Sequence, residues 1–520
     1  MRITNYALHL KGMSRLFIQG LAPILWLILA LSVLKMPAWK ACPVALIISL
    51  IIANQFFDMA VMDVATGTIE GAAMAVWPIL GVIVSAIFAY NLTVHTGGMD
   101  KIKDMLSSVS TDKRMLILII AWGFGAFLEC MSGFGTAVAI GASMLVTIGV
   151  QPVKAVIACL VSNAAMSSFG SVGLPLTTLA KLTNFDALQI ATYTTIQLNA
   201  MVILMPFIML IAFDGFKCLK GMVPACLVGG FGFFIPSVIG ASTMGADLAG
   251  IGGAVFAMAL LVVYAKKFPV KNPEYEIDDY NENFSITFGE AVRAWLVFLL
   301  IFIFLVICSM PAVSAVLKTV ATKIMIYTGP DAAPTTFQWI TTPTILFASA
   351  VIAGLVNKAS VGDMIDVLSR TVKTLIPTFI TIITIIATAR IMGYSGMTMA
   401  IATATVAATG SFYPFIAPLI GSIGAFITGS ATSSCVLLSK LQVDAALAIG
   451  LSETAQAWIA AANASGSCVG KIISPQSIAI GAAAVGAFGV ESQIMKFAVK
   501  VYLPFIIIMG CIVYFGQALL

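Results

Sequence analysis

The sequence predicts an all-α polytopic membrane protein, and three of its properties point to that fold class. Hydrophobic residues make up 60% of the 520 residues and charged residues only 9%, whereas a soluble chain has roughly 25% charged residues. The chain contains many apolar runs of about 17–25 residues, the length that a helix needs to cross a hydrocarbon core. These runs do not alternate in polarity as the strands of a membrane β-barrel would.

The predicted spans follow one another from the N-terminus to the C-terminus. The first apolar run is followed by a basic turn and by further spans, without a small-residue cleavage site, so we interpret it as a span and not as a cleaved signal. The nine cysteines lie mostly inside apolar runs, which predicts small core residues rather than metal ligands or disulfides. The clearest spans lie at 21–34, 41–57, 72–92, 115–128, 196–213, 222–240, 248–265, 291–310 and 499–519.

Residues 266–290 form the most polar segment of the chain and divide it into two halves. Acidic residues and prolines cluster there, which predicts a surface loop. We therefore expect residues 1–265 and 291–520 to form the two halves of the molecule. The net charge of +5 is spread over the loops. This distribution indicates that the charges orient the chain in the membrane, and it does not favour nucleic-acid binding.

Three landmarks recur in the two halves in the same order. Asn163, Gly170 and Pro175 are spaced by seven and five residues in the first half. The second half repeats the spacing with an offset of 300 residues, which predicts an internal repeat. The matching residues are Asn463, Gly470 and Pro475.

Each half also contains two apolar segments that are interrupted by small polar residues, glycine and proline, at 129–141 and 163–175, and at 428–435 and 463–475. Such breaks free backbone N–H and C=O groups, which are tolerated at membrane depth only beside protein or a water-filled cavity. Paired breaks in corresponding halves indicate a transporter's binding site, so we expect two inverted repeats with broken or re-entrant helices meeting at the membrane midplane. Close helix packing explains some of the glycines, but not the accompanying Asn, Ser, Thr and Lys.

Three ionisable residues lie inside apolar sequence, where charges are costly and usually functional. Glu129, in "FGAFLECMSGFGT", has no charged neighbour closer than Arg114, and we interpret it as a proton-carrying group. Lys471 suits an anionic substrate, and Arg390 is a further candidate cation. The alternatives are a carboxylate at a helix end for Glu129, a lysine that reaches the interface for Lys471 and a span end for Arg390.

Small polar groups on the broken segments are the expected hydrogen-bonding partners of the substrate. A site of this kind discriminates between substrates with and without a hydroxyl group. Together with Lys471 and Arg390, the predicted substrate-binding residues are Ser132, Gly133, Thr136, Asn163, Ser167, Thr428, Ser433, Asn463 and Ser465.

Several other functional classes are disfavoured by the sequence. "GSCVGKI" has the wrong glycine spacing for a phosphate loop, so a nucleotide-driven pump is not indicated. The two histidines, His9 and His95, lie near span ends, which argues against a serine hydrolase, and a potassium-filter motif is absent. A secondary transporter is therefore favoured over an enzyme, a channel or a receptor, with no cofactor, no metal and a small organic anion as its partner.

Several stretches resemble the L-lactate permease family: "SNAAMSSFGSVGLPLTTLA", "GAFITGSATSS" and above all "GKIISPQSIAI". The resemblance extends over most of the chain. It implies a proton-coupled symporter for lactate and related 2-hydroxy monocarboxylates such as glycolate, located in a bacterial-type inner membrane. The family pattern carries over to Glu129, Asn163, Asn463 and Lys471.

The chain departs from the family pattern at four positions. Ala137 replaces a proline, Ala431 replaces an aspartate, Cys435 replaces an asparagine, and Arg390 is foreign to the pattern. A lost acid and an added base would make the cavity more positive. The alternative is therefore a symporter or exchanger of another small organic anion with altered coupling.

Overall fold

The computed structural model describes residues 16–34, 36–133, 135–270, 272–277, 285–330, 332–487 and 490–520, without the side chains of residues 32, 136 and 311. Nearly all of these residues are helical. Ten helical stretches are long and apolar enough to cross a membrane, or up to eleven if the bent pair Ala187–Gln197 and Asn199–Asp214 is one span. The predicted class, an all-α multi-pass membrane protein, is confirmed.

The first part of the chain is entirely helical within the described ranges. Its π- and 3-10 helices carry the label η. The elements are η1 (Leu29–Val33), α2 (Ala38–Phe56), α3 (Val61–Met74), η2 (Ala75–Leu80), α4 (Gly81–His95), α5 (Gly98–Ser107), α6 (Lys113–Ile117), η3 (Leu118–Phe124), α7 (Gly125–Ser132), α8 (Thr136–Thr147), α9 (Pro152–Met166), η4 (Ser167–Phe169), α10 (Gly170–Thr183), α11 (Ala187–Gln197), α12 (Asn199–Asp214), η5 (Phe216–Leu219), α13 (Val223–Thr243) and α14 (Ala246–Lys267).

The second part contains a short antiparallel hairpin, with Ala321 of β1 opposite Gln338 of β2, which the sequence analysis does not predict. Each strand has only four residues, too few for a period-two pattern to stand out. The elements are η6 (Pro273–Tyr275), α15 (Phe288–Ser309), α16 (Pro311–Leu317), β1 (Ala321–Ile324), β2 (Thr335–Gln338), α17 (Thr342–Val356), α18 (Val361–Tyr394), α19 (Met397–Thr409), η7 (Gly410–Phe412), α20 (Tyr413–Thr428), α21 (Ala431–Ala448), α22 (Glu453–Lys471), α23 (Pro475–Ala484), α24 (Glu491–Gly516) and η8 (Gln517–Leu519).

Two of the predicted breaks are the tips of helical hairpins. In the break at 129–141, α7 ends where Gly133 adopts a φ of +66°, a conformation that glycine accepts without a Cβ penalty. In the break at 428–435, α20 ends at Gly429, with a φ of +69°. The Ser430 side chain then caps α21 by accepting a backbone N–H.

The other two predicted breaks interrupt the helices beside the hairpins. Ser171 and Val172 have φ values of +47° and +56°, which break the helical path at the start of α10. Left-handed residues other than glycine are strained and cluster at functional sites. In the second half α22 ends at Lys471 and α23 begins at Pro475, whose ring suits the first turn of a new helix.

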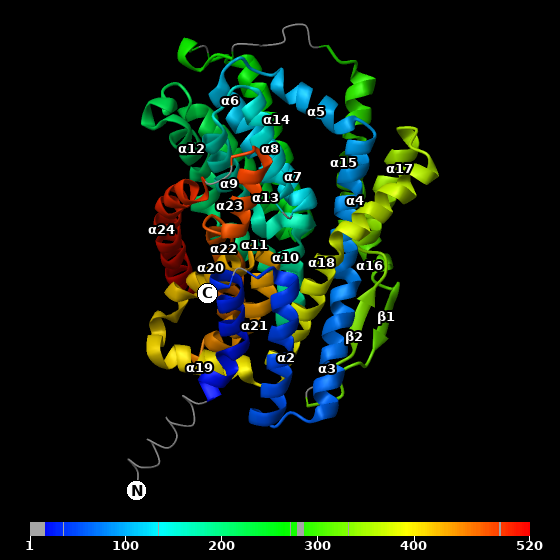
Figure 1. The fold of residues 1–520 in the computed structure, drawn as a ribbon, viewed down its shortest axis with the longest axis vertical. Coiled ribbons are helices and arrows are strands. Elements are labelled where there is room, and N and C mark those ends of the chain that lie inside the picture. Colours follow the sequence, from blue (N-terminus) through cyan, green and yellow to red (C-terminus); the bar gives the residue numbers. More distant parts are fainter. Residues whose placement is uncertain are drawn as a thin grey trace.

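The two halves meet along their broken helices. In Figure 1, the α7–α8 hairpin lies in the upper half of the molecule and α21 in the lower half. Where the halves meet, η4 contacts α22. The Ser168 hydroxyl donates to the Ala464 carbonyl over 2.7 Å, and the Ser168 N–H donates to the Cys468 sulfur over 3.3 Å. Ser168 and Cys468 differ by the repeat offset of 300, as expected of equivalent residues beside a two-fold axis. The inverted relation of the halves and their boundaries at 265 and 291 stay predictions.

Glycines on one face of α22 bring it very close to α20. A Cβ at Gly466 would lie 2.0 Å from the Pro418 carbonyl oxygen, and one at Gly470 would lie 2.1 Å from the Ser422 carbonyl oxygen. This is small-xxx-small packing, the alternative that the sequence leaves open for such glycines. It also holds the end of α22, and therefore Lys471, against the second hairpin.

A fully buried arginine anchors the segment that connects the halves. Arg114 binds Asp112 through two nitrogens, over 2.7 and 3.0 Å, and its Nη1 donates to the carbonyls of Cys218 and Lys220. The ring of Tyr275, from the connecting segment, lies 4.4 Å from the guanidinium carbon. Arg114 thus joins three stretches of chain that are far apart in the sequence.

Replacing Arg114 by alanine is expected to lower the free energy of unfolding by about 3–5 kcal/mol, because Asp112 would remain buried without a charged partner. Thermal unfolding of the purified protein in detergent measures the effect. The matched control is Arg370→Ala, which removes an exposed ion pair with Asp366 and should change stability by less than about 1 kcal/mol. Equal melting temperatures for the two variants would contradict this prediction.

Candidate functional site

All four broken segments contribute to one small cavity at the meeting point of the halves, which we call the central cavity. Its volume is about 40 Å³, room for about three water molecules. From the first half it is lined by Glu129, Gly133, Ser167, Gly170, Ser171 and Pro175. From the second half it is lined by Gly429, Ser430, Ala431, Thr432 and Lys471.

A buried ion pair forms one wall of the central cavity. The Lys471 ammonium lies 2.6 Å from Oε1 of Glu129, and the two residues are only 5% and 1% exposed. The amide of Asn163 donates to the other carboxylate oxygen, Oε2, over 2.6 Å. Each oxygen of Glu129 therefore has a donor. A pair this deeply buried is sensitive to any group that competes for either partner, because a lone buried charge is strongly unfavourable.

The backbone at the breaks holds the ion pair in place. Gly170 leaves room for the carboxylate, since a Cβ there would lie 3.2 Å from Oε1 of Glu129. The Ser171 hydroxyl donates to the Ser132 carbonyl over 2.9 Å and ties the first hairpin tip to α10. The glutamate and the lysine belong to different halves, so their distance depends on how the halves pack.

A much larger cavity, of about 980 Å³, adjoins the central cavity at the second hairpin tip. Ser430 lines both cavities. Gln476 of α23 packs against the tip so closely that a Cβ at Gly429 would lie 2.3 Å from its Oε1. The larger cavity also touches α18 and α24.

Four of the predicted site residues line the central cavity: Glu129, Gly133, Ser167 and Lys471. Asn163 does not line it but binds Glu129 directly. The hydroxyl of Ser132 turns back to donate to the Leu128 carbonyl, so its backbone and not its side chain faces α10.

The remaining predicted residues lie elsewhere. Thr428 and Ser433 line the larger cavity. The hydroxyl of Ser465 donates to Gln197 over 2.7 Å, and Oδ1 of Asn463 accepts from Gln442 over 3.4 Å, in polar networks between helices. The side chain of Thr136 lies outside the described residues.

Arg390 does not line the central cavity. It lies in the second half of α18, where Nη1 donates to the Tyr394 hydroxyl over 3.3 Å and Nη2 contacts the Met74 sulfur. Tyr394 in turn donates to Glu70, a carboxylate that is only 3% exposed and accepts a second hydrogen bond from Thr335 over 2.5 Å. The sequence identifies Arg390 as an intramembrane cation but not the neighbours of that face of α18.

Sequence reasoning missed several residues of the central cavity. Ser171 carried a usable signal, because it is the repeat counterpart of Lys471. Gly429 and Ser430 lie within a predicted break and have the residue types of a hairpin tip.

A buried acid–base pair at the junction of four helix breaks, inside a multi-span helical protein, is the arrangement of a membrane transport protein. A family model described as L-lactate permease matches residues 16–520. The chain belongs to the L-lactate permease family. It is accordingly a permease and not an enzyme.

Curated relatives match over nearly the whole chain. An L-lactate permease of Streptococcus iniae is 39% identical over 456 residues, covering 87% of this chain and 94% of the relative. An L-lactate permease of Escherichia coli strain K12 is 32% identical, covering 94% of each. A glycolate permease of the same strain is 31% identical, covering 98% of this chain and 97% of the relative.

Proposed function

We propose that this protein is a secondary active transporter for small 2-hydroxy monocarboxylates of the lactate and glycolate class. It couples their symport to protons across the inner (plasma) membrane. The family assignment and the relatives named for lactate and glycolate support the substrate class. The observation that carries the coupling is the buried pair of Glu129 and Lys471.

An inside-negative membrane potential opposes the uptake of a monoanion unless a cation such as a proton travels with it. Moving one charge across the membrane requires about 2.3 kcal/mol per 100 mV. A proton that travels with the carboxylate cancels this work. The carrier therefore needs a proton-binding group whose occupancy depends on the substrate.

The ion pair supplies that dependence. Without substrate, Lys471 and Glu129 neutralise each other over 2.6 Å. An arriving carboxylate competes for the ammonium, and Glu129 then takes up a proton, because a lone buried carboxylate is strongly unfavourable. The cavity charge is zero both before and after loading. Empty and loaded carriers can therefore change conformation without electrical work.

The charge of the central cavity favours one proton per substrate. Ala431 lines the cavity where the family resemblance implies a carboxylate, which leaves Glu129 as the one carboxylate among its lining residues in the described part of the chain. Arg390 adds no charge there. The alternative, another small organic anion with altered coupling, was based on a lost acid and an added base. Of these two departures, only the lost acid at Ala431 lies at the central cavity.

Counterflow in proteoliposomes that contain unlabelled lactate, with labelled lactate and competing unlabelled acids outside, tests the substrate class. Lactate and glycolate should exchange efficiently. Propionate, which lacks the hydroxyl, should compete about five- to a hundredfold more weakly, since each buried polar group left unpaired costs about 1–3 kcal/mol. Equal competition by propionate would contradict a hydroxy-acid site, and absence of lactate exchange would contradict the function itself.

A further inference from the structure

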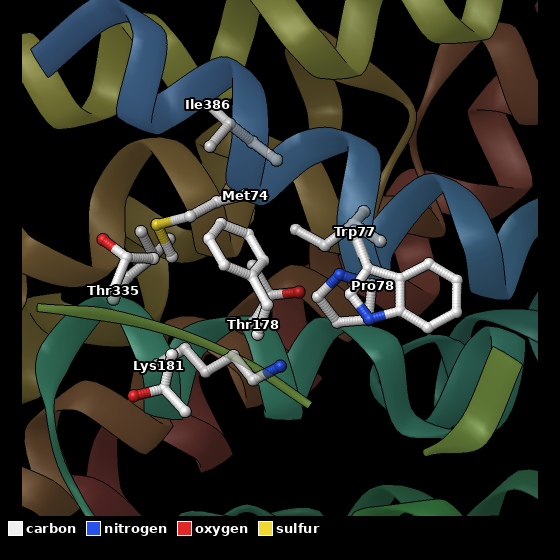
Figure 2. A pocket seen from close by; sticks show the side chains of 11 residues that line it. Met74, Trp77, Pro78, Thr178, Lys181, Thr335 and Ile386 are labelled. Atoms are coloured by element: carbon white, nitrogen blue, oxygen red, sulfur yellow. The ribbon is translucent and has the colours of Figure 1, made fainter. Parts of the chain in front are cut away.

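We propose that a second, smaller cavity beside α10 is a binding site for a small carboxylate. We call it the α10 cavity. It lies between the end of α10, the break at η2, strand β2 and α18. Figure 2 shows Thr178 and Lys181 of α10 facing Met74, Trp77 and Pro78 across it. The identity of the ligand rests on the proposed function; the anion-binding chemistry of the site does not.

Two donors in the wall of the α10 cavity have no hydrogen-bond partner within the described chain. Thr178 is 3% exposed, and its buried hydroxyl lacks any partner. Lys181, one turn further on, is exposed at the lip and forms no hydrogen bond or ion pair with a described residue. Asp247, which binds Thr342 over 2.7 Å, acts on Lys181 only as a more distant charge. Buried donors normally have acceptors, so Thr178 indicates a missing one.

Apart from Thr336, which is exposed, the other side-chain donors of this wall are already used. Thr335 donates its hydroxyl to Glu70, and the Trp77 indole N–H donates to the Gln338 carbonyl over 2.6 Å. The free groups are therefore a hydroxyl and an ammonium. This combination attracts an acceptor with negative charge and repels a cation.

The size of the α10 cavity suits a carboxylate group. Its volume is about 30 Å³, room for about two water molecules. The two oxygens of a carboxylate would replace those waters, one near the Thr178 hydroxyl and one near the Lys181 ammonium.

Helix α10 connects this site to the central cavity. Pro175 lines the central cavity, and Thr178 and Lys181 follow it by three and six residues. At 1.5 Å per residue these positions lie about 4.5 and 9 Å further along the helix. A carboxylate that leaves Lys471 along α10 therefore meets Lys181 next. The α10 cavity can thus serve as a second binding site on the substrate's route.

Equilibrium binding of labelled lactate to the purified full-length protein tests the proposal. Wild-type protein should bind two lactates per chain at saturation. Lys181→Gln should bind one, with the affinity of the second site lowered at least tenfold. The matched control, Lys266→Gln at the exposed end of α14, should bind two. A stoichiometry of one in the wild type, or of two in Lys181→Gln, overturns the proposal.

Thr178→Val separates a binding role from a structural one. Because the hydroxyl has no partner among the described residues, its removal should leave the melting temperature unchanged or higher, while the second lactate binds at least threefold more weakly. A lower melting temperature with unchanged binding would assign the hydroxyl to the fold and overturn its role here.

Two further binding measurements identify the ligand and distinguish this proposal from the proposed function. Formate should displace the second lactate far better than chloride does, and equal displacement by chloride would overturn the carboxylate assignment. Lys471→Ala should lose the central site and keep the second one. If Lys471→Ala binds two lactates while Lys181→Gln binds one, the proposed role of Lys471 in the central cavity is contradicted and the lactate site in the α10 cavity is supported.

Discussion

Replacing Glu129 by glutamine is expected to abolish proton-driven accumulation of lactate while exchange of internal for external lactate persists. The neutral amide imitates the protonated acid, so the loaded carrier keeps its zero charge. The empty carrier instead retains the buried charge of Lys471 without its partner. An unpaired buried charge costs about 3–5 kcal/mol, and each 1.4 kcal/mol is about a factor of ten. Net uptake should therefore fall at least about a hundredfold.

Uptake driven by a pH gradient and counterflow, measured on the same proteoliposomes, separate these two activities. Glu453→Gln is the matched control, because Glu453 is exposed at the opposite end of the helix that ends at Lys471. It should accumulate lactate as the wild type does. Wild-type accumulation by Glu129→Gln would place the coupling group elsewhere.

Replacing Lys471 by alanine is expected to impair binding, exchange and accumulation together. The substrate carboxylate loses a charge-assisted hydrogen bond of about 1.5–3 kcal/mol, so lactate should bind on the order of ten to a hundredfold more weakly. The variant also leaves Glu129 without its ammonium partner, 2.6 Å away in the native protein. The free energy of unfolding should fall by about 3–5 kcal/mol.

The double variant Glu129→Gln/Lys471→Ala distinguishes the loss of stability from the loss of the anion site. It removes both charges, so most of the lost stability should return, whereas lactate affinity should stay low. Thermal unfolding and lactate titration on the same preparations report the two effects. Binding of two lactates with wild-type affinity by Lys471→Ala would show that Lys471 does not bind the anion.

The fold class can be predicted from the sequence alone, because composition identifies the solvent around the chain and the length of an apolar run indicates whether it spans a membrane. The sequence also predicted four helix breaks. Glycine, proline and small polar residues act on their own backbone, so their effect is readable locally. Glu129 and Lys471 stood out for a similar reason, since an ionisable group in an apolar run is costly wherever the run lies.

Which of these features share a site depends on the three-dimensional packing of the helices. The neighbours of a helical side chain depend on how its helix is rotated and packed against other helices. Neither the rotation nor the packing can be predicted from the local sequence. Arg390 therefore faces Tyr394 and Met74, and Thr428 and Ser433 line the larger cavity. The 2.6 Å contact between Glu129 and Lys471 joins residues 342 positions apart. It exists because the two halves bring their broken helices together, an arrangement that depends on long-range packing.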